Sequence, residues 1–148
     1  MAHWLVWFGV GLPKRIRNNK MDYGYQRIID KSFDEVDVAI RETLKEQGFG
    51  VLTEIAVDET LKNKLNEDFR RYKILGACHP PTAFHALSEE PEIGLLLPCN
   101  VTLWENDDGS VTLSAINAKK MLSVTGRDDL DELANQVNSW LKTAVDAV

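Results

Sequence analysis

The chain has 148 residues, which is enough for one domain with a hydrophobic core and too short for two comfortable ones. Hydrophobic residues make up 44% of it and charged residues 27%, as in ordinary soluble globular proteins. The formal net charge is −6, but residues 1–20 contain four basic residues and no acidic one, so the remainder carries −10. Because so acidic a domain repels phosphate backbones, we expect no nucleic-acid partner.

The first twenty residues differ in character from the rest. Their apolar run, Trp4–Leu12, precedes a basic cluster, which is the reverse of a secretory signal, and it is far too short to span a bilayer. Its aromatic residues beside lysine and arginine would also suit a membrane-surface anchor. The favoured interpretation is an extension, 1–20, outside a single domain, 21–148, that starts naturally at Met21. Two cysteines are too few for a disulfide scaffold, so we expect a cytoplasmic protein with reduced thiols and no membrane span.

The first predicted elements are a strand and a long helix. Aromatic and branched residues over about 22–30 favour a strand. Ser32 followed by Glu35 is a capping box, in which each side chain satisfies a backbone donor at the start of a helix. Apolar residues then recur at helical spacing, so a helix is predicted over 33–47, and Gly48 stands where a left-handed C-cap residue is wanted.

The middle of the chain alternates strands with short helices. Strands are predicted over 49–57 and 72–78, because both segments are rich in branched apolar residues. Asp58 suits the N-cap of a short helix between them. Proline at position 81 suits the first turn of another short helix, since that turn needs no backbone donor. The buried stripe expected on this second helix consists of Ala83, Phe84 and Leu87.

The last third of the chain predicts a hairpin and a second long helix. Strands 95–105 and 111–117 flank the segment NDDGS (106–110), a strong hairpin signal. Asp128 or Asp129 is expected to cap the final helix, whose acidic first turn complements the helix dipole. The apolar face of this helix consists of Leu130, Leu133, Ala134, Val137, Leu141, Ala144 and Val148.

The order of these elements predicts an α+β fold. One strand, a long helix, four strands and a second long helix are most economically arranged as two layers, an antiparallel sheet with both long helices on one face. Such a sheet leaves its second face in need of cover. A homodimer or a small-molecule ligand could provide it.

Four segments resemble a known family. The segments GFGVLTEI, ILGACHPP, EPEIGLLLPCNV and AIN…ML, in this order, resemble the family of domain of unknown function 302, small stand-alone proteins of bacteria and archaea. The resemblance covers essentially all of 21–148. It implies a TBP-like α+β fold in β-α-β(4)-α order and homodimers, and it implies no reaction. Members often carry Asn where this chain has His79. The positions that match the motifs are Gly76, Cys78, Pro80, Glu92, Gly94, Pro98, Cys99 and Asn100.

The two cysteines are the residues with the most chemistry to offer. With His79, the thiolates of Cys78 and Cys99 would approach a tetrahedral shell for zinc or Cu(I). They lack the C-x-x-C spacing, however, and Glu92 or a dimer mate would have to complete the shell, so we expect no metal. Both cysteines end strands beside the same excursion, so a redox pair with Cα atoms about 4.4–6.8 Å apart is geometrically plausible. The favoured interpretation is that they are inert thiols in apolar surroundings.

No catalytic constellation accompanies these residues. The sequence contains no Gly-rich phosphate loop and no G-x-S-x-G nucleophile elbow, so no catalytic residue and no cofactor are predicted. The expected function is non-catalytic binding of a small ligand or a protein partner by a homodimer. The alternative is a thiol-based redox or soft-metal-binding protein that uses Cys78 and Cys99. The candidate ligand-binding residues are Cys78, His79, Glu92, Cys99 and Asn100.

Overall fold

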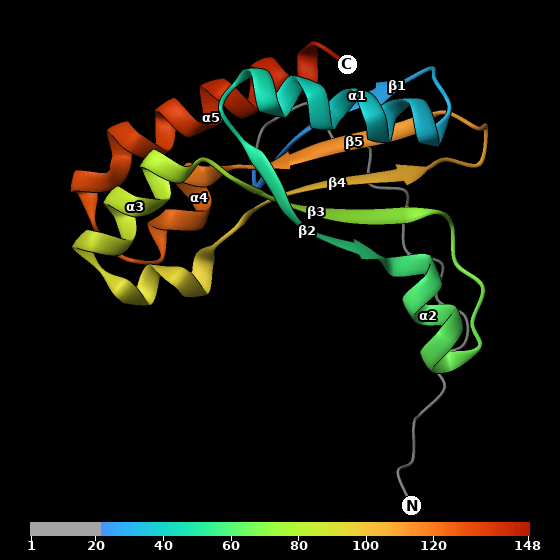
Figure 1. The fold of residues 1–148 in the computed structure, drawn as a ribbon, viewed down its shortest axis with the longest axis horizontal. Helices are drawn as coiled ribbons and strands as arrows, with labels where there is room; N and C mark the ends of the chain where they lie inside the picture. The colour runs from blue at the N-terminus through green and yellow to red at the C-terminus, as the bar shows by residue number, and fades with distance from the viewer. Residues whose placement is uncertain (1–21) are drawn as a thin grey trace, which may run out of the picture.

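The computed structural model describes residues 22–148 (Figure 1). The extension expected at 1–20 and the expected domain start at Met21 therefore lie outside the described residues. The elements in chain order are β1 (Gly24–Ile29), α1 (Phe33–Glu46), β2 (Gly50–Ala56), α2 (Val57–Leu65), β3 (Tyr72–Cys78), α3 (Pro80–Glu89), the 3-10 helix η1 (Pro91–Leu96), β4 (Cys99–Glu105), β5 (Val111–Ile116), α4 (Ala118–Ser123), the 3-10 helix η2 (Asp128–Leu130) and α5 (Asp131–Asp146).

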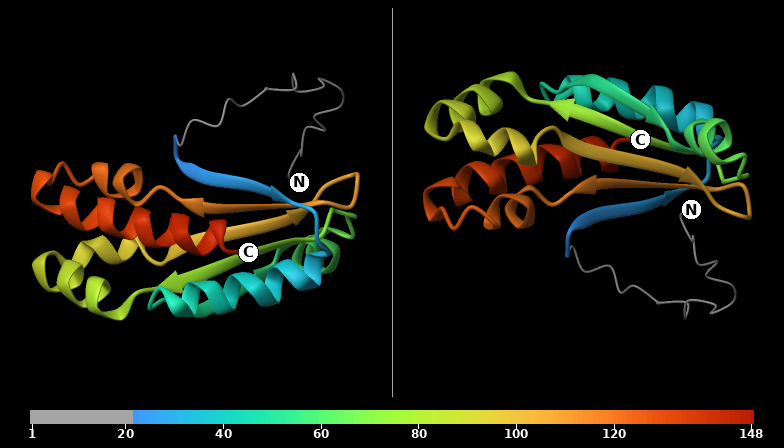
Figure 2. Two further views of the ribbon diagram at one scale, coloured as in Figure 1. Left: turned by 90° about the horizontal axis from the view of Figure 1, so that it is seen from above. Right: turned by 90° about the horizontal axis from the view of Figure 1, so that it is seen from below.

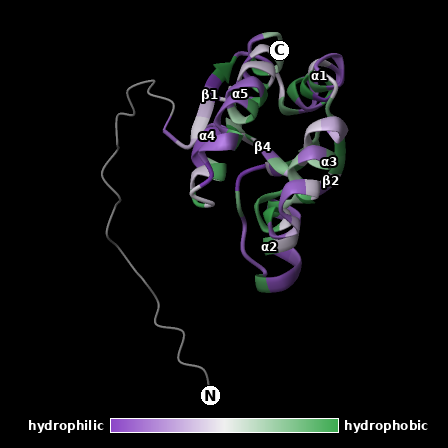
Figure 3. Ribbon diagram, turned by 90° about the vertical axis from the view of Figure 1, so that its left-hand side faces the viewer, coloured by the Kyte–Doolittle hydropathy of each residue, from purple (hydrophilic) through white to green (hydrophobic). Residues whose placement is uncertain are grey.

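The strands form one open antiparallel sheet. Its order is β1-β5-β4-β3-β2, and every pair of neighbours is antiparallel. Helices α1 and α5 lie together on one face, and the view from below shows the strands in front of both (Figure 2). Seen from the end that carries α3 and α4, the long helices again lie on the same side of the strands (Figure 3). The predicted two-layer α+β fold is confirmed. Among the described residues, none of the helices combines the length and apolarity that a bilayer crossing requires.

The start and end of α1 follow the sequence signals. The Glu35 backbone N–H donates to the Ser32 hydroxyl at 3.2 Å, and the Ser32 backbone N–H donates to the Glu35 carboxylate at 2.9 Å. Both bonds of the capping box are therefore formed, and the same bonds lower the pKa of Glu35. At the other end Gly48 has φ = 84°, a left-handed conformation that glycine adopts without steric cost.

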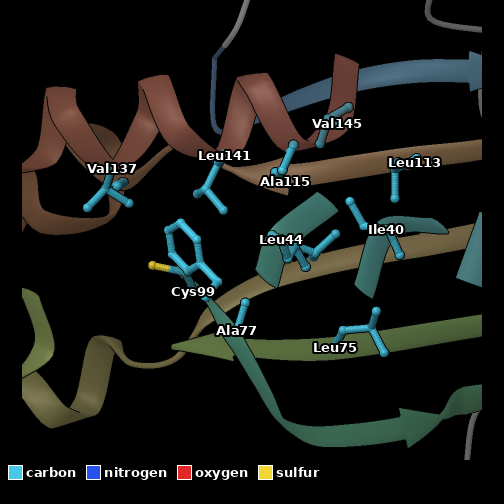
Figure 4. Packing of buried hydrophobic residues seen from close by; sticks show 14 of the residues in the cluster. Ile40, Leu44, Leu75, Ala77, Cys99, Leu113, Ala115, Val137, Leu141 and Val145 are labelled. Carbon is cyan, nitrogen blue, oxygen red and sulfur yellow. The ribbon is translucent and has the colours of Figure 1, made fainter. Parts of the chain in front are cut away.

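The core lies between the two long helices and the sheet (Figure 4). Leu44 of α1, Leu75 of β3, Leu113 of β5 and Leu141 of α5 are all fully buried, and Figure 4 shows these side chains pointing into the same layer. Burying a leucine of this kind stabilises the fold by about 1.5–3 kcal/mol. The expected apolar face of α5 is thus confirmed in its central residues.

The start of α5 differs from the prediction. Asp128 and Asp129 belong to the 3-10 turn η2, and α5 begins at Asp131 after Leu130, without a side-chain cap. Leu130 is 2% exposed, so the chain enters the helix while a buried side chain holds it against the core. Two acidic residues, Asp131 and Glu132, still occupy the first turn, where they complement the helix dipole.

The sequence predicted that Asp58 caps α2, and this prediction is wrong. This helix begins one residue earlier, at Val57, and no side chain caps it. The Asp58 carboxylate instead accepts a hydrogen bond from the backbone N–H of Tyr72 at 3.1 Å. Strand β2 runs directly into the helix, so the carboxylate is free to fix the first residue of β3.

The stripe expected on α3 is wrong. Phe84 is 77% exposed and Leu87 is 38% exposed, whereas Ala86 is the buried residue of this helix. The reason is placement: α3 lies beyond the end of the sheet (Figure 1), so only a narrow side of it meets the rest of the domain. The strand expected from residue 95 is also too long, because 91–96 form η1 and β4 begins at Cys99, after a cis Leu97–Pro98 peptide.

Candidate functional site: an apolar cavity at the end of the sheet

A cavity of about 300 Å³ lies where β3 ends and β4 begins. Its walls come from that end of the sheet, from α3, η1 and α4, and from the first half of α5. The cavity exists because the connection between the neighbouring strands β3 and β4 leaves the sheet, and because small side chains face the space behind it. The alanines in its wall are Ala77, Ala83, Ala86 and Ala118.

The lining is almost entirely apolar. None of the described residues around the cavity is an aspartate, glutamate, lysine or arginine. The polar side chains in the wall are those of Thr53, Cys78, His79, Thr82 and Cys99. Ligand sites in proteins are typically of this kind, with apolar walls and a few polar groups that fix orientation.

Cys99 is the more deeply placed thiol. It pairs with Ala77 across β4 and β3 and is 9% exposed. Figure 4 shows its sulfur directed away from the centre of the sheet, below Val137 of α5. Burial raises the pKa of the Cys99 thiol to about 11, with the nearby Cys78 as a second cause. At neutral pH Cys99 is therefore a protonated thiol.

Cys78 borders the same cavity from a more open position. It ends β3 opposite Gly50 and is half-buried. Strand alternation assigns it to the face of Tyr72 and Ile74, opposite that of Cys99. The two thiols nevertheless reach one cavity because both stand at the strand ends around which the cavity lies. Both are free thiols.

His79 forms part of the wall through packing and one hydrogen bond. Its ring stacks on Trp140 with centroids 4.4 Å apart and lies 5.3 Å from the ring of Phe49. Its Nδ1 is 2.8 Å from the Thr82 hydroxyl. Burial lowers the pKa of His79, which favours the neutral ring. A side chain at Gly48 would press on this ring, since a Cβ built there lies 3.0 Å from His79 Nε2.

The described residues around this histidine do not form a metal-binding group. Within residues 22–148, no group of three or more His, Cys, Asp or Glu side chains could hold a metal ion. Cys78, His79 and Cys99 meet in the cavity wall, but Glu92, the residue of this chain expected to complete a metal shell, is not among the lining residues.

Glu92 and Asn100 lie outside the cavity. Asn100 pairs with Gly76 on the face of the sheet away from the long helices and is exposed. Glu92 is an exposed residue of η1. Both are close in sequence to Cys99, but strand alternation and the turn of η1 direct them elsewhere.

Several lining residues were missed by sequence reasoning. Thr82, Met121 and Val137 come from three helices, and only their packing at the end of the sheet brings them together. One local signal was present: Ala83 and Ala86, three residues apart, give α3 a small-residue side that faces the cavity.

The comparisons with known proteins agree with the fold. The model of the family described as "Domain of unknown function DUF302" matches residues 25–148. The chain belongs to the DUF302 family. A crystal structure described as that of an uncharacterized conserved DUF302 protein from Bacillus stearothermophilus matches this DUF302 chain with a TM-score of 0.79 and 26% sequence identity, over 84% of this chain and 97% of that one. No curated protein matches. The family resemblance predicted from the sequence is confirmed, and the function has to be argued from the cavity.

Proposed function

We propose that this DUF302 domain binds a small apolar molecule in the cavity at the end of the sheet. The observation that carries the proposal is a cavity of about 300 Å³ with an apolar, uncharged wall, at the lower end of the range of about 300–1,000 Å³ for ligand sites. A water molecule in the liquid occupies about 30 Å³, so this space suits a ligand of about ten non-hydrogen atoms. A substituted benzene or a short alkyl chain has that size.

The expected affinity is modest. Small ligands gain between about 0.3 and 1.5 kcal/mol per non-hydrogen atom, so ten atoms at about 0.5 kcal/mol give about 5 kcal/mol, a Kd of about 0.2 mM. The gain comes from filling space, since atoms that face a void lack dispersion partners. Binding is favoured over catalysis because Cys99 holds its proton and His79 is occupied by Thr82.

A titration with toluene tests the proposal. We expect toluene to shift the backbone NMR signals of the lining residues Ala77 and Cys99. Its seven non-hydrogen atoms at about 0.5 kcal/mol each give about 3.5 kcal/mol, so the titration should have a Kd of about 3 mM. Ala83→Phe places a ring in the cavity and should abolish the shifts. Ala147→Phe, at the exposed C-terminal end of α5, is the matched control and should leave them unchanged. Shifts that survive Ala83→Phe in a folded protein, or no shifts at all, would contradict the proposal.

We also propose that a second copy of the chain covers the open face of the sheet. Two copies of net charge −6 repel each other, so a contact between them is favoured where it adds no further like charge. The strand residues directed away from α1 and α5 carry no charge. Where β3 begins, Tyr72 stacks on Trp104 of β4 with centroids 5.5 Å apart. On the edge strands Ile28 is 70% and Ile55 is 49% exposed. The other members are Gly24, Gln26, Gly50, Thr53, Ile74, Gly76, Asn100, Thr102, Thr112, Ser114 and Ile116. Cys78, at the end of β3, borders the cavity and lies outside this contact.

Sedimentation of the chain tests the dimer. We expect a dimer of 16.7 kDa subunits that Ile28→Asp converts to a monomer. Val38→Asp changes an equally apolar exposed residue on the outer side of α1 and should leave the dimer intact. A monomeric wild-type chain at micromolar concentration, or a dimer insensitive to Ile28→Asp, would contradict this part of the proposal.

The second candidate function is thiol-based redox or soft-metal chemistry in a reducing cytoplasm. The observation that favours it is that the free thiols of Cys78 and Cys99 border one cavity. Hydrogen peroxide would oxidise both thiols to one disulfide, with two electrons and two protons passing to the peroxide to give water. A count of two free thiols after peroxide treatment, and no metal by elemental analysis, would exclude this candidate. Because the raised pKa of Cys99 keeps its thiol protonated and unreactive, this redox or metal candidate is weaker than the small-ligand proposal.

A further inference from the structure

The two thiols that border the cavity stand in unlike surroundings. Cys99 is nine-tenths buried, and among the described residues no hydrogen bond to its thiol is formed. It is a polar group that faces the cavity without a partner. Cys78 is half-buried at the end of β3 and lines the same cavity, so it is the more accessible of the two thiols. A ligand in the cavity therefore meets one sheltered thiol and one accessible thiol.

We propose that Cys78 covalently captures an apolar electrophile bound in this cavity, of the class of short α,β-unsaturated aldehydes and ketones. The proposal rests on the proposed function, because the cavity must first bind the hydrocarbon part of the ligand. The thiol sulfur adds to the β-carbon, so one sulfur–carbon bond forms and the π bond between the α- and β-carbons breaks. The thiol proton ends on the α-carbon. The addition is balanced without an oxidant, a reductant or a metal.

The wall supplies what this addition needs. The side chains around Ala86 and Val137 hold the hydrocarbon chain, and an uncharged wall accepts a neutral enal more readily than a charged ligand. Cys99 does not compete for the electrophile, because burial raises the pKa of its thiol to about 11 and keeps it protonated.

Thr82 is the side chain that can act on the carbonyl oxygen. Its hydroxyl is 2.8 Å from Nδ1 of His79, and it borders the cavity. When His79 carries its proton on Nδ1 and donates it to the Thr82 oxygen, the Thr82 hydroxyl is left to donate to the ligand. Negative charge develops on the carbonyl oxygen as the sulfur adds, so a donor there stabilises the transition state more than the ground state.

Intact-mass measurements on the full chain with trans-2-hexenal test the proposal. We expect one adduct, mapped to Cys78, whose rate of formation saturates with hexenal concentration and falls in the presence of toluene. Ala83→Phe should slow adduct formation at least tenfold, and Ala147→Phe should not. Cys78→Ser should form no adduct. Thr82→Val should slow the addition about tenfold, and Thr82→Ser should restore its rate.

The outcomes separate this inference from the proposed function. Toluene binding without an adduct at Cys78 overturns the inference and leaves the proposed function standing. An adduct at Cys78 whose rate rises linearly with hexenal, and ignores toluene and Ala83→Phe, is ordinary surface thiol chemistry and also overturns it. Failure of toluene to bind, together with that linear rate, overturns both.

Discussion

The pKa of the Cys99 thiol gives the most quantitative prediction about the cavity. In a Cys78→Ser variant Cys99 is the only thiol of the chain. A pKa of about 11 leaves about one thiolate in a thousand at pH 8, whereas an unperturbed thiol of pKa 9.0 leaves about one in ten. Because the thiolate is the reactive form, alkylation of native Cys99 should be about 100-fold slower than in the denatured chain.

Iodoacetamide labelling followed by intact mass measures this difference. The logarithm of the labelling rate of the native variant should rise by one for each pH unit up to about pH 11. In urea the same rate should level off near pH 9, which serves as the control. Cys78 is the second cause of the raised pKa of Cys99, so its replacement by serine lowers the pKa of native Cys99 slightly. A native rate that levels off near pH 9 would refute the placement of Cys99 in a buried, apolar wall.

The same pKa has a consequence for stability. Below pH 9 the Cys99 thiol is protonated in both the folded and the unfolded chain, so its contribution is fully present. As pH rises from about 9 to about 11, the unfolded chain loses this proton first, which favours unfolding. Relative to Cys99→Ala, the wild-type free energy of unfolding should fall by about 2 kcal/mol between pH 8 and pH 10.5. The free energy of unfolding of each protein is measured by urea denaturation at each pH. Equal pH dependences of this free energy for the two proteins would contradict the prediction.

Three substitutions test local features by urea denaturation. The new methyl group of Gly76→Ala would overlap the Thr53 hydroxyl and should lower the free energy of unfolding by about 1–3 kcal/mol. The loss should be smaller in a Thr53→Ala background, and equal losses in both backgrounds would exclude that contact. Ser32→Ala removes half of a capping box and should cost about 1 kcal/mol, so an unchanged midpoint would argue against the cap. Gly48→Ala forces an alanine to positive φ against the ring of His79 and should cost at least about 1 kcal/mol, whereas a neutral effect would mean that the turn is relaxed.

The elements that the sequence predicts best are those whose signals are local. Helix α1 combines a capping box, a helical apolar period and a terminal glycine, and each acts within a few residues. The hairpin between β4 and β5 is read from the turn around Gly109, which has φ = 84°. In contrast, exposure on α3 depends on where the helix lies, and no local pattern records that Phe84 faces solvent while Ala86 faces the core.

For the same reason, the sequence predicts the cysteines of the candidate site but not the cavity that they border. Cys78 and Cys99 were expected at strand ends that border the same short-helix excursion, so their approach to one cavity could be anticipated. The cavity itself could not, because its space is left by alanines on two helices and a strand that meet only in the folded chain. Asn100 and Glu92 were chosen because they are close to Cys99 in sequence. Alternation along β4 directs Asn100 to the other face of the sheet, and the turn of η1 directs Glu92 away from the cavity.

A crystal structure determined under xenon pressure tests the central claim most directly. Xenon enters apolar cavities that lack water, and its electron density is visible whatever the natural ligand is. The cavity between Ala86, Cys99 and Val137 should hold a xenon atom in the wild-type protein and none in Ala83→Phe. A wild-type structure in which this space is filled by ordered water or by a shifted side chain, with no xenon, would contradict the account.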